Sequence, residues 1–299
     1  MRFRQTCIAY VVGVITSLNA VSAQGLATEF DGFGIFSAPG NLFELATRES
    51  SAPEERERIE TERHDFTQST TTVGRGVAQL EFGYTYFYRD DGAETEESHA
   101  TPELMLRYGL TEDLEFRMRY NNAWQFGEED LRGSEDLRWA IKFRATDQED
   151  WLPESAVELR FATPTGTDEW STDDVEFGFD YIYGWRFSPT MELYGSTGFS
   201  TNALGEFAFA PADPGNDDFI LYTQSVALGV ELTEQVSFYS EFFGLFTDGF
   251  EDSEESPIFF NVGFDYYVND DFVLDARIGT GLNDDAEDLF VGVGGAFRF

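Results

Sequence analysis

The chain has 299 residues, of which 57 are Asp or Glu and 19 are Lys or Arg, and its formal net charge is −38. This charge excludes a nucleic-acid-binding protein, because phosphates require a basic surface. The aromatic content of 16%, with 31 Phe residues, excludes a disordered chain, because so many rings imply a large apolar surface to bury.

The first 23 residues have the pattern of an export signal. Arg2 and Arg4 form a positive region, residues 8–18 form an apolar stretch, and residues 21–23 are small, as at a cleavage site. A membrane anchor is the alternative, but the apolar stretch is too short to span a bilayer. We therefore predict a signal peptide over 1–23. The single cysteine, Cys7, lies within it, so we expect no thiol chemistry in the mature protein.

Residues 24–75 differ from the rest of the chain. They include a dense charged run from Glu49 to His64 without a clean apolar stripe. We expect an irregular or partly helical N-terminal segment, which is either a periplasmic extension or a plug. A flexible leader is the alternative.

From residue 76 to the C-terminus, apolar and polar side chains alternate. The clearest case is 114–121, where Leu114, Phe116, Met118 and Tyr120 alternate with Glu115, Arg117, Arg119 and Asn121. This period of two predicts strands rather than helices. Twelve such segments are predicted, at 76–89, 100–110, 114–124, 135–145, 154–163, 174–187, 191–200, 218–232, 235–247, 257–268, 272–282 and 288–299.

The connections between these segments alternate in length. The short connections are 111–113, 146–153, 188–190, 233–234 and 269–271. The longer connections are acidic, and they cover 90–99, 125–134, 164–173, 201–217, 248–256 and 283–287. Short turns at one end and long loops at the other are typical of outer-membrane barrels.

A soluble β-sandwich also alternates, but two features disfavour it. Residues 175–187 present seven apolar side chains on one face, more than a thin sandwich core needs. The opposite face mixes small residues with paired acids and bases, as a barrel lumen does. We predict an all-β fold: an antiparallel up-and-down transmembrane β-barrel of about twelve strands over 76–299, with short periplasmic turns and longer acidic outer loops.

The predicted inward face contains both signs of charge. The basic candidates to face a solute are Arg107, Arg117, Arg119, Arg138, Lys142, Arg144 and Arg160. The acidic lumen candidates are Glu115, Glu158, Glu176, Asp180, Asp265 and Asp275. The bases concentrate on the early strands and the acids on the later ones, which indicates either a field that steers solutes or ion pairs that fill and stiffen the lumen.

The last strand ends in an aromatic residue. Val291, Val293, Gly295, Phe297 and Phe299 share one face, and Phe299 is the final residue. This pattern resembles the insertion signal of outer-membrane barrels, so Phe297 and Phe299 are predicted to be read by the barrel-assembly machinery. Closure of the last strand on the first would remove an exposed edge.

Three stretches resemble a known family: ETERHDFTQSTTTVGRGVAQLEFGYTY at 60–86, PELMLRYGLTEDLEFRMRY at 102–120 and the closing LNDDAEDLFVGVGGAFRF. They are similar to the bacterial outer-membrane β-barrels described as "Putative MetA-pathway of phenol degradation", over residues 60–299. The resemblance implies the outer membrane of a Gram-negative-type bacterium, with lipid and lipopolysaccharide as surroundings. It also implies uptake of small solutes, aromatic or hydrophobic compounds among them.

Enzyme chemistry is not expected. An outer-membrane phospholipase needs Ser, His and Asn or Asp together, but the two histidines, His64 and His99, lie before the barrel and beside a loop. No cofactor or metal site is predicted. The acidic loops, such as 90–97 and 284–288, lack the residue spacing of a calcium-binding loop, and the simpler interpretation is that their carboxylates are solvated.

The predicted function is therefore passive uptake of small solutes by a monomeric channel or transporter. Solutes either cross the charged lumen or enter near the aromatic outer rim and leave sideways into the membrane. The alternative is a structural or adhesive barrel without transport.

Overall fold

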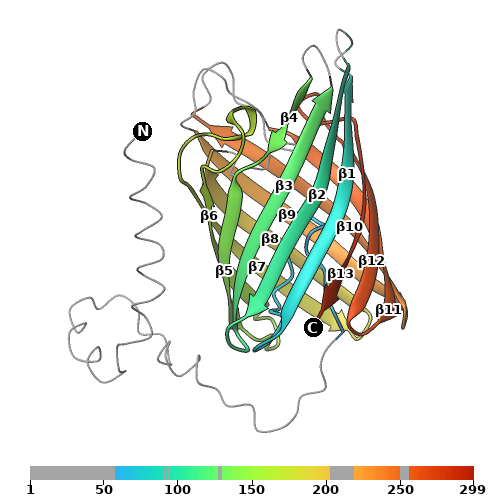
Figure 1. Ribbon diagram of the computed structural model, residues 1–299. Coiled ribbons are helices and arrows are strands. Elements are labelled where there is room, and N and C mark those ends of the chain that lie inside the picture. The colour runs from blue at the N-terminus through green and yellow to red at the C-terminus, as the bar shows by residue number, and fades with distance from the viewer. Residues whose placement is uncertain (1–57, 91, 93–94, 127–129, 203–218, 250–255) are drawn as a thin grey trace, which may run out of the picture. The chain divides into compact units, whose positions relative to one another are not determined.

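The computed structural model describes residues 58–299 apart from 91, 93–94, 127–129, 203–218 and 250–255. The predicted signal peptide, and residues 24–57 of the predicted N-terminal segment, lie outside the described residues. The described chain forms a closed antiparallel β-barrel (Figure 1). No helix among the described residues is long and apolar enough to cross a membrane.

The barrel has twelve long strands and one short one. The strands are β1 (Ala78–Asp90), β2 (Thr95–Gly109), β3 (Leu114–Phe126), β4 (Leu131–Ser134), β5 (Leu137–Thr146), β6 (Glu154–Thr163), β7 (Glu176–Ser188), β8 (Met191–Thr201), β9 (Ile220–Thr233), β10 (Val236–Asp248), β11 (Ile258–Asn269), β12 (Phe272–Gly281) and β13 (Leu289–Arg298). A 3₁₀ turn, η1 (Asp168–Trp170), lies between β6 and β7. Both β4 and β5 pair with β3, β4 at Asn122 to Gln125 and β5 at Leu114 to Arg119, so they form one interrupted strand. The prediction of about twelve strands is confirmed.

Each long strand pairs with its neighbours in the chain, and the first strand pairs with the last. The β1–β13 register runs from Gln79 opposite Arg298 to Tyr88 opposite Leu289. Ala78 and Phe299 exchange backbone hydrogen bonds of 3.1 and 2.9 Å at the end of this seam. Closure pairs the edge of the last strand with that of the first, as the alternation of the last strand predicted.

The two faces of the sheet have opposite character. Phe177 and Phe187 are each 61% exposed on the outer face, whereas Glu115, Lys142 and Glu241 are completely buried on the inner face. A contiguous apolar exterior of this kind requires lipid. The predicted transmembrane barrel with a polar lumen is therefore the observed fold.

The two ends of the barrel also differ. The turns that follow β2, β5, β7, β9 and β11 are short and lie at the end where the chain terminates (Figure 1). We call this the turn side and the opposite end the loop side. The main difference from the predicted boundaries is β2, which begins five residues earlier because the polar residues Glu96 and Ser98 extend the strand on the loop side.

Candidate functional site in the barrel lumen

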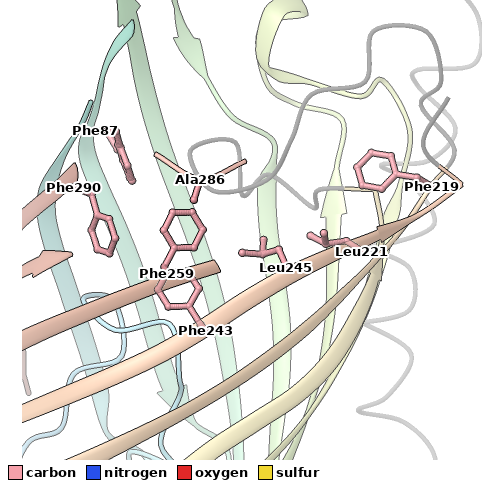
Figure 2. Packing of buried hydrophobic residues seen from close by; sticks show 9 residues of the cluster. Phe87, Phe219, Leu221, Phe243, Leu245, Phe259, Ala286 and Phe290 are labelled. Carbon is pink, nitrogen blue, oxygen red and sulfur yellow. The ribbon is translucent and has the colours of Figure 1, made fainter. Parts of the chain in front are cut away.

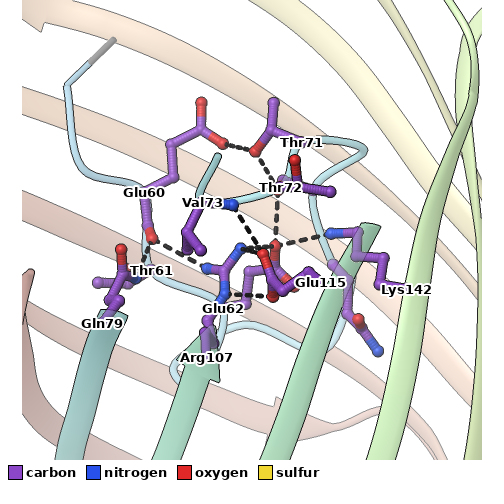
Figure 3. A network of polar contacts seen from close by, with 12 residues as sticks. Glu60, Thr61, Glu62, Thr71, Thr72, Val73, Gln79, Arg107, Glu115 and Lys142 are labelled. Atoms are coloured by element: carbon purple, nitrogen blue, oxygen red, sulfur yellow. Dashed lines mark hydrogen bonds and ion pairs between the residues drawn. The ribbon is translucent and has the colours of Figure 1, made fainter. Parts of the chain in front are cut away.

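Residues 58–75 lie inside the barrel, and we call them the inserted segment. The segment starts at the turn side, where the Ile59 amide donates a 2.9 Å hydrogen bond to the Asp270 carbonyl. It rises to Phe66 and returns to the turn side, where the Val73 amide donates to Glu115 over 2.7 Å. Figure 3 shows this turn-side half of the segment beside β1, β2 and β3. A segment without strand pairing satisfies its backbone polar groups through side chains of the barrel wall.

Glu62 is the centre of the buried charge network. Its carboxylate lies 3.0 Å from Arg107, 2.7 Å from Arg117 and 2.8 Å from Lys142. Glu115 accepts from Arg107 over 2.7 Å (Figure 3). It also accepts from Arg117 over 2.6 Å. Although burial opposes its ionisation, the three cations hold the pKa of Glu62 well below its usual value. The carboxylate is therefore charged and binds the segment to β2, β3 and β5.

Arg63 binds the opposite wall of the barrel. Its guanidinium donates to Glu103 over 2.8 Å and pairs with Asp275. Glycines make room for it, because a Cβ at Gly83 or at Gly294 would lie 2.3 Å from a guanidinium atom. The wall of β1 and β13 is therefore shaped to accept this side chain.

His64 and Asp65 follow in the same turn. His64 bonds Thr61 through Nδ1 at 2.9 Å and lies 3.2 Å from Asp265 through Nε2. Burial lowers the pKa of His64 despite the nearby carboxylate. Oδ1 of Asp65 is buried and has no hydrogen-bond partner among the described residues. Burial, together with the charge of Glu241, raises the pKa of Asp65 well above its usual value.

Phe66 forms the tip of the segment and meets an aromatic cluster. Its ring stacks on Phe243 with centroids 4.4 Å apart. Figure 2 shows the cluster in the loop-side half of the barrel. Its members are Phe87, Ala100, Phe219, Leu221, Phe243, Leu245, Phe259, Ala286 and Phe290. The lumen thus changes from charged on the turn side to partly apolar on the loop side.

Two cavities lie on either side of the inserted segment. The loop-side cavity has a volume of about 110 Å³ and is lined by Arg119, Arg138 and Arg160 among others. The turn-side cavity has a volume of about 620 Å³ and is lined by Glu192, Glu231 and Glu234 among others. Asp65 lines both, so the segment around it is the wall between them.

The structure brings most of the predicted site residues together. Arg107, Arg117, Lys142, Glu115 and Glu158 belong to the network around Glu62. Arg160 pairs with Asp180 at 2.6 Å on the loop side.

Four predicted residues lie elsewhere. Asp265 and Asp275 contact His64 and Arg63. Glu176 accepts from Thr172 and Asn202 near the loops. Arg144 lies apart from both cavities and pairs with Asp113 at 3.0 Å.

The path of the inserted segment and the apolar part of the lumen were not predicted. Glu241 accepts from the amides of Phe66 and Thr67, and neither it nor Glu62 was predicted as a site residue. One signal was available: Phe87, Phe243, Phe259 and Phe290 occupy inward positions where the alternation calls for polar residues. Among residues 58–299 outside the gaps, no group of three or more His, Cys, Asp or Glu is placed to hold a metal ion.

Known proteins resemble the chain in sequence family and in structure. The model of the family described as "Putative MetA-pathway of phenol degradation" matches residues 61–299. No curated protein matches the chain. Among solved structures, the NanC porin is similar at 8% identity with a TM-score of 0.48, covering 74% of this chain and 100% of the porin.

Two further structures are similar at the same level. The translocator domain of the autotransporter NalP from Neisseria meningitidis is 10% identical with a TM-score of 0.49, covering 76% of this chain and 89% of that domain. The KdgM porin in complex with disordered oligogalacturonate is 8% identical with a TM-score of 0.48, covering 74% of this chain and 99% of the porin. These identities and TM-scores are too low to transfer a solute or a mechanism to this chain.

Proposed function

We propose that this chain, which belongs to the family described as "Putative MetA-pathway of phenol degradation", is an outer-membrane transporter for the passive uptake of small solutes. The observation that carries the proposal is the pair of cavities in line along the lumen, of about 110 and about 620 Å³. A barrel built only to anchor itself needs no interior space, and eight-stranded barrels are filled by side chains. The family description names phenol degradation, which makes aromatic compounds candidate solutes.

In this proposal the inserted segment is a plug that moves. Its ion pairs to Arg107, Arg117 and Lys142 are buried, and buried pairs gain little net free energy because their desolvation is costly. When the segment leaves, water can solvate both partners again. A charged plug can therefore be seated specifically and still be released.

The location follows from the exterior of the barrel. Outward Phe177, Phe187 and Phe242 are more than half exposed and require lipid. Phe297 and Phe299 are exposed at the turn-side end of the seam, where assembly machinery could bind them before closure. Insertion through these two residues, export through residues 1–23 and a monomeric state remain predictions.

A cross-link tests whether the segment must move. Oγ1 of Thr67 donates to Oγ of Ser225 over 2.7 Å, so the double variant Thr67→Cys/Ser225→Cys places two thiols within disulfide reach. With cleavage after Ala23 these are the only thiols. We expect low conductance in a planar bilayer when the pair is oxidised and higher conductance after reduction.

The matched control cross-links the wall without the segment. Ser196 and Ser225 lie 2.8 Å apart on β8 and β9, and Ser196→Cys/Ser225→Cys should conduct equally when oxidised and reduced. Equal, non-zero conductance of the Thr67 pair in both states would contradict the moving plug. Silence of every variant and of the wild type would contradict the transporter and favour a structural barrel, for which the dense pairing around Glu62 is the supporting observation.

A further inference from the structure

The loop-side cavity has a basic wall in a strongly acidic protein. Six arginines line it, contributed by the inserted segment, β3, β5, β6 and β12: Arg63, Arg117, Arg119, Arg138, Arg160 and Arg277. Five carboxyl groups also line it, one fewer than the arginines: Glu62, Asp65, Glu103, Glu158 and Asp180. The cavity therefore has an excess of positive charge, although the chain has a net charge of −38.

One arginine in this wall has unused hydrogen-bonding capacity. Arg117 is only 3% exposed, and its Nε and Nη1 are engaged by Glu115, Glu62 and Glu158. Its Nη2 is buried and has no hydrogen-bond acceptor among the described residues. A buried guanidinium nitrogen without an acceptor is costly, and a carboxylate in the cavity would supply one.

The opposite wall of the cavity is apolar. It includes Phe66, Leu221 and Leu245, which are backed by the aromatic cluster of Figure 2. The volume of about 110 Å³ is below the roughly 150 Å³ of an apolar cavity that holds one benzene molecule. A single ring therefore enters only if the lining side chains move outward slightly, and larger solutes need a larger movement.

We propose that the loop-side cavity is a binding site for a small organic anion with an apolar ring, with its carboxylate against the arginines and its ring against Phe66 and Leu245. The inference rests on the proposed function, because the cavity lies on the proposed route and the anion would be a transported solute. The turn-side cavity has the opposite character: Glu60, Glu154, Glu192, Glu231, Glu234 and Asp265 line it against Arg58 and Arg186. An anion is therefore held on the loop side and repelled from the turn side.

Equilibrium binding to the refolded full mature chain in nanodiscs tests the site. The probes are benzoate, acetate, which has the charge without the ring, and benzyl alcohol, which has the ring without the charge. Calorimetric titrations are corrected with empty nanodiscs. We expect benzoate to bind about tenfold or more tightly than either of the other two, because only benzoate contacts both walls.

Two wall variants and a control assign the binding to this cavity. Arg119→Gln should weaken benzoate binding about tenfold and leave benzyl alcohol unchanged. Leu245→Ala should weaken benzoate and leave acetate unchanged. Arg298→Gln is the control, because Arg298 pairs with Asp271 at the turn side and lines neither cavity. Heat-dependent migration in gels verifies that each variant is folded.

Several outcomes would overturn the site. Equal affinity for benzoate and benzyl alcohol would show that the site does not recognise the charge. Equal affinity for benzoate and acetate would show that the apolar wall contributes nothing to binding. If Arg298→Gln and Arg119→Gln weakened benzoate binding equally, the loss would reflect the overall charge of the protein and not this cavity. A barrel that conducts without binding benzoate refutes the site alone, whereas one that binds benzoate without conducting refutes transport alone.

Discussion

Oε1 of Glu62 lies 2.8 Å from Nζ of Lys142, and both side chains are completely buried although they are 80 positions apart in the chain. This pair joins the inserted segment to β5. Arg107 and Arg117 also converge on the same carboxylate.

Glu62→Gln should destabilise the barrel by about 3 kcal/mol, because it leaves three buried cations with one carboxylate fewer. Since the pKa of Glu62 is lowered, its contribution is present above its unfolded pKa and is lost as the pH falls through the folded value. Denaturant unfolding in micelles at neutral and at acidic pH measures both effects.

The control for this prediction is an exposed pair. Arg144 is 40% exposed where it pairs with Asp113, so Asp113→Asn should change the free energy of unfolding by less than about 1 kcal/mol. The double variant Glu62→Gln/Lys142→Met should recover part of the unfolding free energy that Glu62→Gln loses. We expect an interaction energy between the two substitutions of about 1 kcal/mol or more. Equal effects of Glu62→Gln and Asp113→Asn would refute the importance of the buried network.

Asp65→Asn should stabilise the protein increasingly as the pH rises. Since burial raises the pKa of Asp65, the folded chain retains a proton that the unfolded chain releases above about pH 4. Wild-type stability therefore falls as the pH rises from that value toward the raised pKa, whereas Asn does not titrate. The free energies of unfolding of the wild type and the variant, measured at pH 5 and pH 8, give the stabilisation at each pH. A stabilisation by Asp65→Asn that is smaller at pH 8 than at pH 5 would contradict the raised pKa of Asp65.

Gly83→Ala should displace Arg63 and increase conductance. Its Cβ would lie 2.3 Å from the guanidinium carbon, so the contact of Arg63 with Glu103 cannot persist in its present geometry. Gly184→Ala is the matched control, because its nearest neighbour would lie at 3.3 Å. Single-channel recording compares the two, and similar conductance in both variants would argue against a gating role for Arg63.

Arg119→Gln should shift the ion selectivity toward cations. Arg119 lines the loop-side cavity, and the variant removes one positive charge there. Arg117 is unsuitable for this measurement. It pairs with Glu62, Glu115 and Glu158, so its substitution would change the stability of the barrel as well as its charge. Reversal potentials in a KCl gradient, with Arg298→Gln as the control, measure the shift; an unchanged potential would mean that the basic wall does not steer ions.

Alternation along the chain was enough to predict the barrel. Leu114 to Asn121 alternate so regularly that the inward positions of Glu115, Arg117 and Arg119 follow from the period of two alone. The same rule predicted closure through the last strand, because β13 offers an apolar outer face and would otherwise leave an edge. These features are local, since each strand carries its own pattern.

The path of the inserted segment could not be predicted in this way, because it depends on contacts between distant parts of the chain. Glu62, Arg63 and Phe66 carry no periodic pattern, and their partners lie on strands that are up to 212 positions away, as Asp275 is from Arg63. Only closure of the barrel brings Lys142, Glu241 and Asp275 around one space. The sequence by itself thus determined the barrel and the two faces of its wall. The tertiary structure decided what lies inside, because burial and charge pairing in the lumen act between strands rather than along them.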